Sequence, residues 1–226
     1  SEVRNGNYSK GIPIVEQAIA AQDSPVGKCV KSSGLARAYA YSGNIPLALE
    51  ALEQAKYNRN QTVSWSRLSS KWRFRMDAFL HMATGDICNV TGKLKEAEKH
   101  LRKAVSIFAP FREKRVSSAV ASRSNAMVHN GMTSSLAENL RRQGRLVEAE
   151  YYARKALEGA IRSHGRYSPH TGNQVNIFAK VLLDQGRTHE ANHLAGTVIK
   201  IFDRIHVSKE NLLYSHAHSI LADSIL

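Results

Sequence analysis

A glycine-centred pattern returns five times along this chain. In each copy a polar or basic residue follows the glycine, and a small residue lies five positions after it, Gly11 in the first copy and alanine in the others. The five glycines are Gly6, Gly43, Gly92, Gly144 and Gly186. They are separated by 37, 49, 52 and 42 residues. Intervals of this size indicate stacked structural repeats, each of which must bury its apolar surface against the next.

The residues around each glycine predict a helix, a turn and a second helix. Upstream, larger or small apolar residues recur eight, seven and four positions before most of the glycines, as in Leu136, Ala137 and Leu140, which is one stripe of a helix. Downstream, a second small or β-branched residue lies twelve positions after the glycine. Glycine suits the turn because a residue just past a helix end often needs positive φ. Small residues then allow the two helices to approach closely.

Composition supports an all-α fold. The chain has 226 residues, only 5 of them proline, and 42% are hydrophobic. Ala, Leu, Lys, Arg and Glu recur throughout, and these residues favour helix. No apolar run approaches the roughly 18–20 residues of a membrane span, so we expect no membrane contact. The predicted fold is an α-solenoid, or superhelix, of about ten helices arranged as antiparallel pairs.

The pattern resembles the tetratricopeptide repeat, which has a small residue midway along its first helix, glycine at the turn and two alanines in its second helix. In the C-terminal half the resemblance is to kinesin-light-chain repeats, carried by 133–145, 148–157, 164–171 and 176–179. It departs from the pattern at an insert, Tyr57–Arg75. The resemblance implies a TPR-like superhelix that binds proteins.

We expect residues 1–226 to form a single array. The predicted units are 1–25 (second helix only), 26–60, 61–110, 111–165, 166–208 and 209–226 (first helix only). Because both outer hairpins are incomplete, we expect the parent protein to continue on at least one side. Bacterial proteins of this kind often attach such arrays to an effector such as a caspase-like CHAT peptidase. A regulatory repeat region of a larger enzyme therefore stays open as an alternative.

Few catalytic or metal-binding patterns are present in the sequence. Of the ten histidines, His189 and His193 have His-x-x-x-His spacing, and no Gly-x-Ser-x-Gly elbow or phosphate-binding loop is present. We therefore predict no enzymatic activity, no cofactor and no metal. Cys29 and Cys88 match no ligand spacing, and buried thiols in a reducing compartment explain them best. This predicts a cytoplasmic location.

The resemblance places a binding surface on the concave face, which the first helices line. Inward-facing positions lie ten, six, three and two residues before each turn glycine. The predicted peptide-binding residues are Arg37, Tyr41, Asn89, Arg141, Arg142, Asn176 and Lys180. Asparagine can pair with peptide amides, and arginine can bind a carboxylate through two hydrogen bonds. An ordinary solvated helix face is the alternative interpretation.

The charge of the chain leaves two kinds of partner open. A net charge of +13 favours an acidic protein or peptide, and also permits nucleic acid. Lys71, Arg73 and Arg75 alternate with Trp72 and Phe74, a pattern that can bind nucleic acid by charge and stacking. Helical spacing instead makes one buried stripe of aromatic and methionine side chains, and we favour that interpretation. The stripe consists of Trp65, Trp72, Met76 and Phe79.

Overall fold

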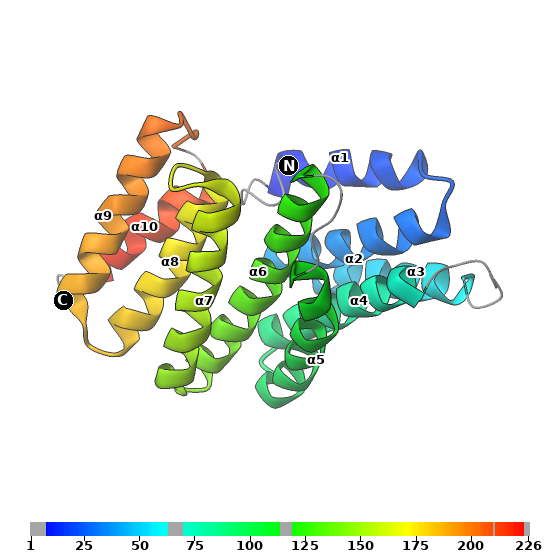
Figure 1. Cartoon of the computed structure of the whole chain (residues 1–226), viewed down its shortest axis with the longest axis horizontal. Helices are drawn as coiled ribbons and strands as arrows, with labels where there is room; N and C mark the ends of the chain where they lie inside the picture. The colour runs from blue at the N-terminus through cyan, green and yellow to red at the C-terminus, as the bar shows by residue number, and fades with distance from the viewer. Residues whose placement is uncertain (1–7, 63–69, 114–118, 210, 224–226) are drawn as a thin grey trace. The chain divides into compact units, whose positions relative to one another are not determined.

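The computed structural model describes residues 8–62, 70–113, 119–209 and 211–223 and contains ten α-helices, with no strand among these residues (Figure 1). The all-α prediction is confirmed. The helices are α1 Tyr8–Ala20, α2 Pro25–Tyr41, α3 Ile45–Asn60, α4 Ser70–Val90, α5 Leu94–Glu113, α6 Ala119–Arg142, α7 Leu146–His164, α8 Pro169–Asp184, α9 Thr188–Arg204 and α10 Leu212–Asp223.

The chain divides into two compact units, residues 8–111 and residues 112–226. In the first unit α2 packs against α1, α3 and α4. In the second unit each helix from α6 to α9 packs against the next, and α8 also contacts both α6 and α10. The helices thus form pairs, and the first helix of one pair touches the first helix of the next. This is the contact pattern of stacked helix-pair repeats.

The four glycines that were predicted to lie at turns do lie there. Gly43, Gly92, Gly144 and Gly186 have φ values of 86°, 80°, 75° and 75°, in the left-handed region. At each turn the residue after the glycine donates its N–H to a carbonyl five residues earlier; for Arg187 and the Leu182 oxygen this distance is 2.9 Å. These bonds satisfy carbonyls that the end of the helix leaves without partners. Gly6 lies outside the described residues.

We expect Gly186→Ala to lower the free energy of unfolding by about 1–2 kcal/mol, because a Cβ is strained at positive φ. Gly196→Ala is the matched control: Gly196 lies within α9, and a Cβ there would have no neighbour within 4 Å. That change should raise the free energy of unfolding by about 0.5–1 kcal/mol. Urea denaturation followed by circular dichroism measures both. Equal effects would contradict the assignment of Gly186 to a strained turn.

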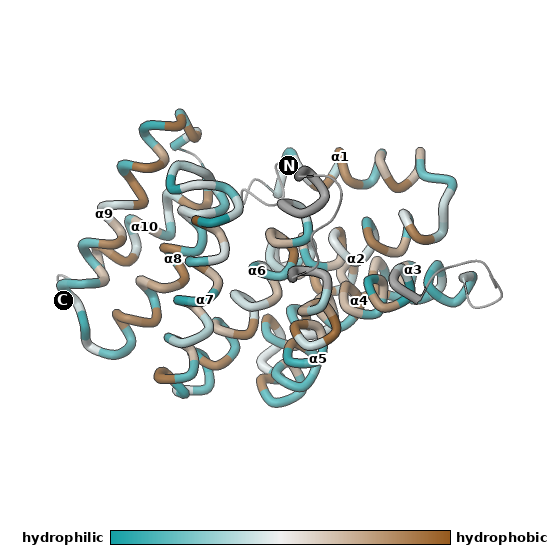
Figure 2. The backbone as a smooth tube through the Cα atoms, viewed as in Figure 1, coloured by the Kyte–Doolittle hydropathy of each residue, from teal (hydrophilic) through white to brown (hydrophobic). Residues whose placement is uncertain are grey.

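The small residues of the pattern lie at the helix contacts. Every position five and twelve residues after the four turn glycines is at most 1% exposed. These residues are Ala48, Ala55, Ala97, Ala104, Ala149, Ala156, Ala191 and Val198. In Figure 2 hydrophobic and hydrophilic stretches alternate along α8 and α9, as expected of helices that are buried on one side. The core of each unit is therefore a seam of alanines flanked by larger apolar side chains.

Gly172 of α8 allows a close approach between two helices of the second unit. A Cβ at this position would lie 2.2 Å from Cε1 of Phe202 on α9. The Phe202 ring is fully buried, and its centroid lies 5.3 Å from that of Tyr214 on α10. A side chain at residue 172 would displace this ring, so α8 and α9 depend on glycine there for their spacing.

One core prediction was wrong. The stripe of Trp65, Trp72, Met76 and Phe79 was expected to be buried, but Trp72 is 44% exposed. Phe74, which was not part of the stripe, is 52% exposed. Met76 is fully buried as expected, and Phe79 packs edge-on against Phe108 at a centroid distance of 6.1 Å. Trp72 lies on the outside instead, where the Arg75 guanidinium stands 5.1 Å from its ring centroid. Trp65 and the side chain of residue 71 lie outside the described residues.

Candidate functional site

Arg37 of α2, a predicted site residue, forms an ion pair with a neighbouring repeat. Its Nε donates to Oδ2 of Asp86 on α4 at 2.5 Å, and the Asp86 side chain is fully buried. Burial by itself lowers the pKa of Arg37, but the Asp86 carboxylate outweighs this effect and raises it. The charge of Arg37 is therefore largely neutralised within the fold. It contributes less to an anion-binding surface than the sequence suggested.

The two other predicted residues of the first unit differ in exposure. Tyr41, at the end of α2, is 41% exposed and can contact a partner. Asn89 of α4 is buried, with only 3% of its surface accessible. Its amide therefore belongs to the packed interior of the unit. Tyr41 is the better candidate for direct contact.

Arg141 of α6 also forms ion pairs within the fold. Its Nε and Nη2 donate to the two carboxylate oxygens of Glu138, each at 2.9 Å, and Nη1 donates to Asp184 of α8 at 2.6 Å. Hydrogen bonding to Glu138 and then the charge of Asp184 raise the pKa of Arg141. The guanidinium thus joins the first helices of two consecutive repeats. The neighbouring Arg142 is exposed.

Asn176 of α8 uses its amide inside the fold. The side chain is 1% exposed, and Nδ2 donates to the backbone oxygen of Leu213 on α10 at 2.9 Å. The amide was predicted to pair with the backbone of a bound peptide. In the structure it pairs with the backbone of the next first helix, and so sets the register between α8 and α10.

The first helices α6, α8 and α10 of the second unit, with α8 in contact with both others, form a three-helix face on which Lys180 and His216 lie. Lys180 follows Asn176 by one helical turn, and His216 follows Leu213 by three residues, so the Asn176–Leu213 bond brings both to one level. Both side chains are half-buried. Burial lowers the pKa of Lys180, and burial together with the Lys180 charge lowers the pKa of His216 to about 4. Within the described residues the Lys180 amine makes no hydrogen bond or ion pair.

His216 was not predicted to belong to the surface, and Asp86, Glu138 and Asp184 were not predicted to pair with its basic residues. A signal for Asp86 was present. Residues six positions before the turn glycines are Arg37, Asp86, Glu138 and Lys180. Equal register positions on consecutive first helices become neighbours in a solenoid, so opposite charges there predict ion pairs. This holds for Arg37 with Asp86, whereas Glu138 pairs with Arg141 of its own helix. His216 gave no comparable signal, because no turn glycine follows it in the sequence.

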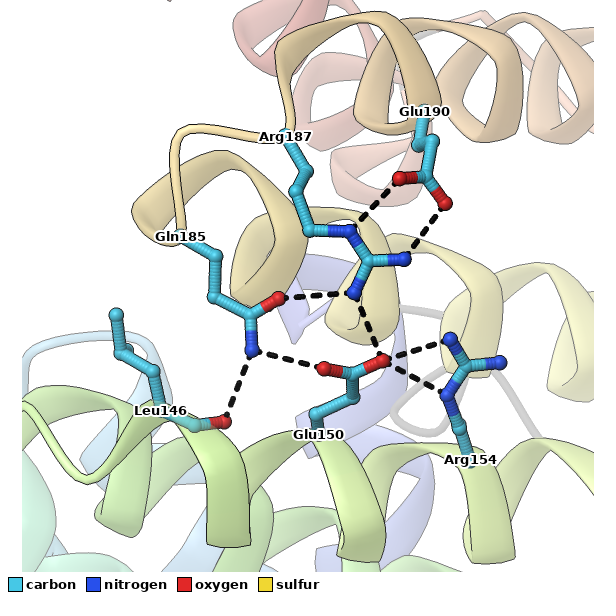
Figure 3. A network of polar contacts seen from close by, with 6 residues as sticks. All are labelled: Leu146, Glu150, Arg154, Gln185, Arg187 and Glu190. Carbon is cyan, nitrogen blue, oxygen red and sulfur yellow. Dashed lines mark hydrogen bonds and ion pairs between the residues drawn. The ribbon is translucent and has the colours of Figure 1, made fainter.

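A second polar network ties α7 to the Gly186 turn of the same unit (Figure 3). Glu150 accepts hydrogen bonds from Arg154 at 2.6 and 2.9 Å, from Arg187 at 2.9 Å and from Gln185 at 2.8 Å. Arg187 in turn binds both oxygens of Glu190 at 2.7 Å. Partial burial raises the pKa of Glu150, but these donors dominate and lower it to about 2. The network joins α7 to the turn before α9, and the carboxylates of Glu150 and Glu190 are both paired within it.

Glu150→Gln should reduce the free energy of unfolding at neutral pH by about 1–2 kcal/mol, the value of charge-assisted bonds that remain partly exposed. The lowered pKa stabilises the fold above the ordinary value of 4.5, and this contribution declines as the pH falls toward 2. The difference in the free energy of unfolding between Glu150→Gln and the parent protein should therefore become smaller as the pH falls from 4.5 toward 2. Glu158→Gln on the same helix, which removes an exposed pair with Arg162, is the control and should cost less than about 0.5 kcal/mol. Urea titrations at several pH values measure both changes.

No group of three or more histidine, cysteine or acidic side chains is placed to hold a metal in the described part of the chain. Cys29 and Cys88 are free and buried, as expected, and burial raises the pKa of the Cys29 thiol to about 12. Across the described helices, none is long and apolar enough to cross a membrane.

Antiparallel helix pairs, left-handed glycine turns and contacts between successive first helices define the fold as a TPR-like helical-repeat solenoid. Residues 126–204 match the family model described as tetratricopeptide repeat, which confirms the predicted repeat type in this part of the chain. Tetratricopeptide repeats are generally protein-interaction scaffolds, and a fold of this kind is typically non-enzymatic.

Solved structures extend the likeness to most of the chain. The TPR-like repeats of a putative kinesin light chain from Podosopora anserina match over 92% of each chain, at 20% identity and a TM-score of 0.51. BtubC (BKLC) from P. vanneervenii matches over 99% of this chain and 85% of its own, at 13% identity and a TM-score of 0.59. At these identities the likeness concerns the fold alone. No curated protein sequence matches this chain.

Proposed function

We propose that this chain is a protein-interaction scaffold that binds an acidic peptide or segment on the face formed by the first helices of its repeats. The observation that carries the proposal is the three-helix face of the second unit. There α8 contacts α6 and α10. The half-buried Lys180 amine lies among them, with no hydrogen bond or ion pair from the described residues. An ammonium group that has lost part of its hydration gains from a carboxylate ligand.

The structure changes which predicted residues we place in direct contact with the partner. Arg37 and Arg141 already bind carboxylates, and Asn89 and Asn176 are buried, so each of these four stabilises the first helices of its own unit. We place Lys180 and Arg142 of the second unit in contact with the partner, and we add His216. Tyr41 is a separate contact candidate on the first unit. The chain has 32 basic and 19 acidic residues, and this excess of positive charge favours acidic partners through long-range attraction. The two buried free thiols support a reducing compartment such as the cytoplasm.

An array of immobilised peptides, with acidic sequences beside matched amide sequences, tests the proposal on the full chain. We expect acidic peptides to be selected, and Lys180→Gln to weaken the selected peptide about tenfold, the loss of one charge-assisted contact. Lys200→Gln removes the same charge from an exposed site on the second helix α9 and should change affinity less than twofold. Equal losses from both substitutions would show that only overall charge matters and would refute the proposed face.

Single-stranded nucleic acid is the second candidate, and the exposure of Trp72 and Phe74 favours it. Both rings are about half exposed beside Arg75, so bases could stack on them. Titration with single-stranded RNA at two salt concentrations should then show affinity that falls steeply with salt. Replacing both Trp72 and Phe74 with alanine should weaken RNA binding at each salt concentration. No binding at low salt would exclude this function.

A further inference from the structure

Two histidines face each other across the contact between α4 and α5 in the first unit. Nδ1 of His81 lies 2.9 Å from Nδ1 of His100, and the ring centroids are 5.1 Å apart with the planes tilted by 42°. Both side chains are half-buried. The nearest approach of the two rings is therefore nitrogen to nitrogen, at hydrogen-bond distance.

This geometry limits how many protons the pair can hold. One Nδ1 must carry the hydrogen and the other must accept it, because two bare nitrogens would repel and two N–H groups would collide. The donor ring can take one further proton on its Nε2 and keep the bond. A second added proton must go to the accepting Nδ1, and this removes the acceptor. The contact is thus compatible with no added proton or with one, and incompatible with two.

The surrounding charges do not offset this constraint. Asp77 of α4 and Glu96 of α5 are the acidic neighbours, whereas Lys56 of α3 and Lys99 and Lys103 of α5 are basic. Asp77 already binds Arg59 of α3 through both carboxylate oxygens. Burial is the largest influence, and it lowers the pKa of both histidines.

We propose that His81 and His100 form a proton-sensitive latch between α4 and α5, closed by one Nδ1–H···Nδ1 hydrogen bond and opened by double protonation. The apolar contacts of the two helices, such as Phe79 with Phe108, do not titrate and hold the pair together when the latch opens. Opening therefore loosens α4 against α5 and leaves the unit folded. Because α4 also carries Asp86, the partner of Arg37, the latch couples pH to the packing of α2 against α4.

The thermodynamic sign follows from the lowered pKa values. Below pH 6.5 the unfolded chain binds more protons at these two residues than the folded chain does. Stability supplied by the latch is thus fully present above pH 6.5 and declines as the pH falls toward the folded-state values. The parent protein should lose more stability on acidification than a variant that lacks both imidazoles.

The test compares the full chain with H81F, H100F and the double variant by urea denaturation at about pH 7.5 and about pH 5. Between these two values we expect the unfolding equilibrium constant of the parent to rise roughly fivefold more than that of the double variant, the worth of one hydrogen bond. The control H193Q removes an exposed histidine of α9 and should leave the pH dependence unchanged. An identical pH dependence in the parent and the double variant would overturn the latch.

Nitrogen-15 NMR of the parent chain gives an independent answer even where a variant fails to fold. One ring of the pair should be the Nδ1–H tautomer at neutral pH and the other the Nε2–H tautomer, and their titrations should be coupled. Two Nε2–H tautomers that titrate independently would show that no proton is shared, and would refute the proposal.

Discussion

Replacing Arg37 with methionine is expected to lower the free energy of unfolding of residues 8–111 by about 3–5 kcal/mol. The physical reason is the fully buried Asp86 carboxylate, which receives the Arg37 Nε at 2.5 Å. Without the guanidinium a negative charge would remain in the interior without its counterion. In the described part of the chain Oδ1 of Asp86 already has no hydrogen-bond donor, so nothing else on that oxygen could compensate.

Two further variants show whether the cost arises from the unpaired charge. Combining Arg37→Met with Asp86→Leu removes both charges and should restore most of the lost stability. Lys56→Met breaks an exposed ion pair with Glu53 and should cost less than about 1 kcal/mol. Urea denaturation of the full chain measures all three variants. A loss below 1 kcal/mol for Arg37→Met would contradict the assignment of a buried, charge-dependent pair.

This prediction affects how binding experiments on the proposed face are interpreted. A partner lost on substitution of Arg37 would not by itself show that Arg37 contacts that partner, because the substitution destabilises α2 and α4 of the first unit. The double variant separates the two effects: it restores the fold and still lacks the guanidinium. Lys180 needs no such correction, because it has no ion pair within the described residues.

The second large effect is expected at Phe202. Its side chain is fully buried between the backbone of Gly172 and the ring of Tyr214, so Phe202→Ala leaves a cavity at the centre of the α8, α9 and α10 contact. Truncations of this kind cost about 3–5 kcal/mol. Tyr151→Ala removes an aromatic ring that is 59% exposed on α7, and it should cost less than about 1 kcal/mol.

The close contact with Gly172 allows a double-mutant test of this packing. Gly172→Ala alone should destabilise by about 1–3 kcal/mol, because its Cβ would lie 2.2 Å from the Phe202 ring. In the Phe202→Ala background the same methyl group would enter the cavity and cost much less. The two losses should therefore sum to clearly more than the loss in the double variant. Additive effects would show that the ring is not positioned by the glycine backbone.

The candidate site was partly predictable, and the residues that were not predicted share a reason. Spacing from the turn glycines placed Lys180, Glu138 and Arg141 on first helices at related levels. Spacing alone could not show which charges are neutralised, because that depends on side chains from another repeat, such as Asp184 against Arg141. His216 entered the surface only through the register that the Asn176 amide sets between α8 and α10.

The sequence alone was enough to determine the repeat, because the repeat depends on the residue types at particular positions. These are glycine where φ is positive, alanine where helices touch, and helix-forming residues between them. These features depend on the few residues around each position, so they can be read without knowing the fold. Tertiary structure alone decided which polar groups are paired, why Trp72 is exposed and Asn176 buried, and how His81 meets His100 nineteen residues away. Each of these depends on the distance between helices, which only the packed chain fixes.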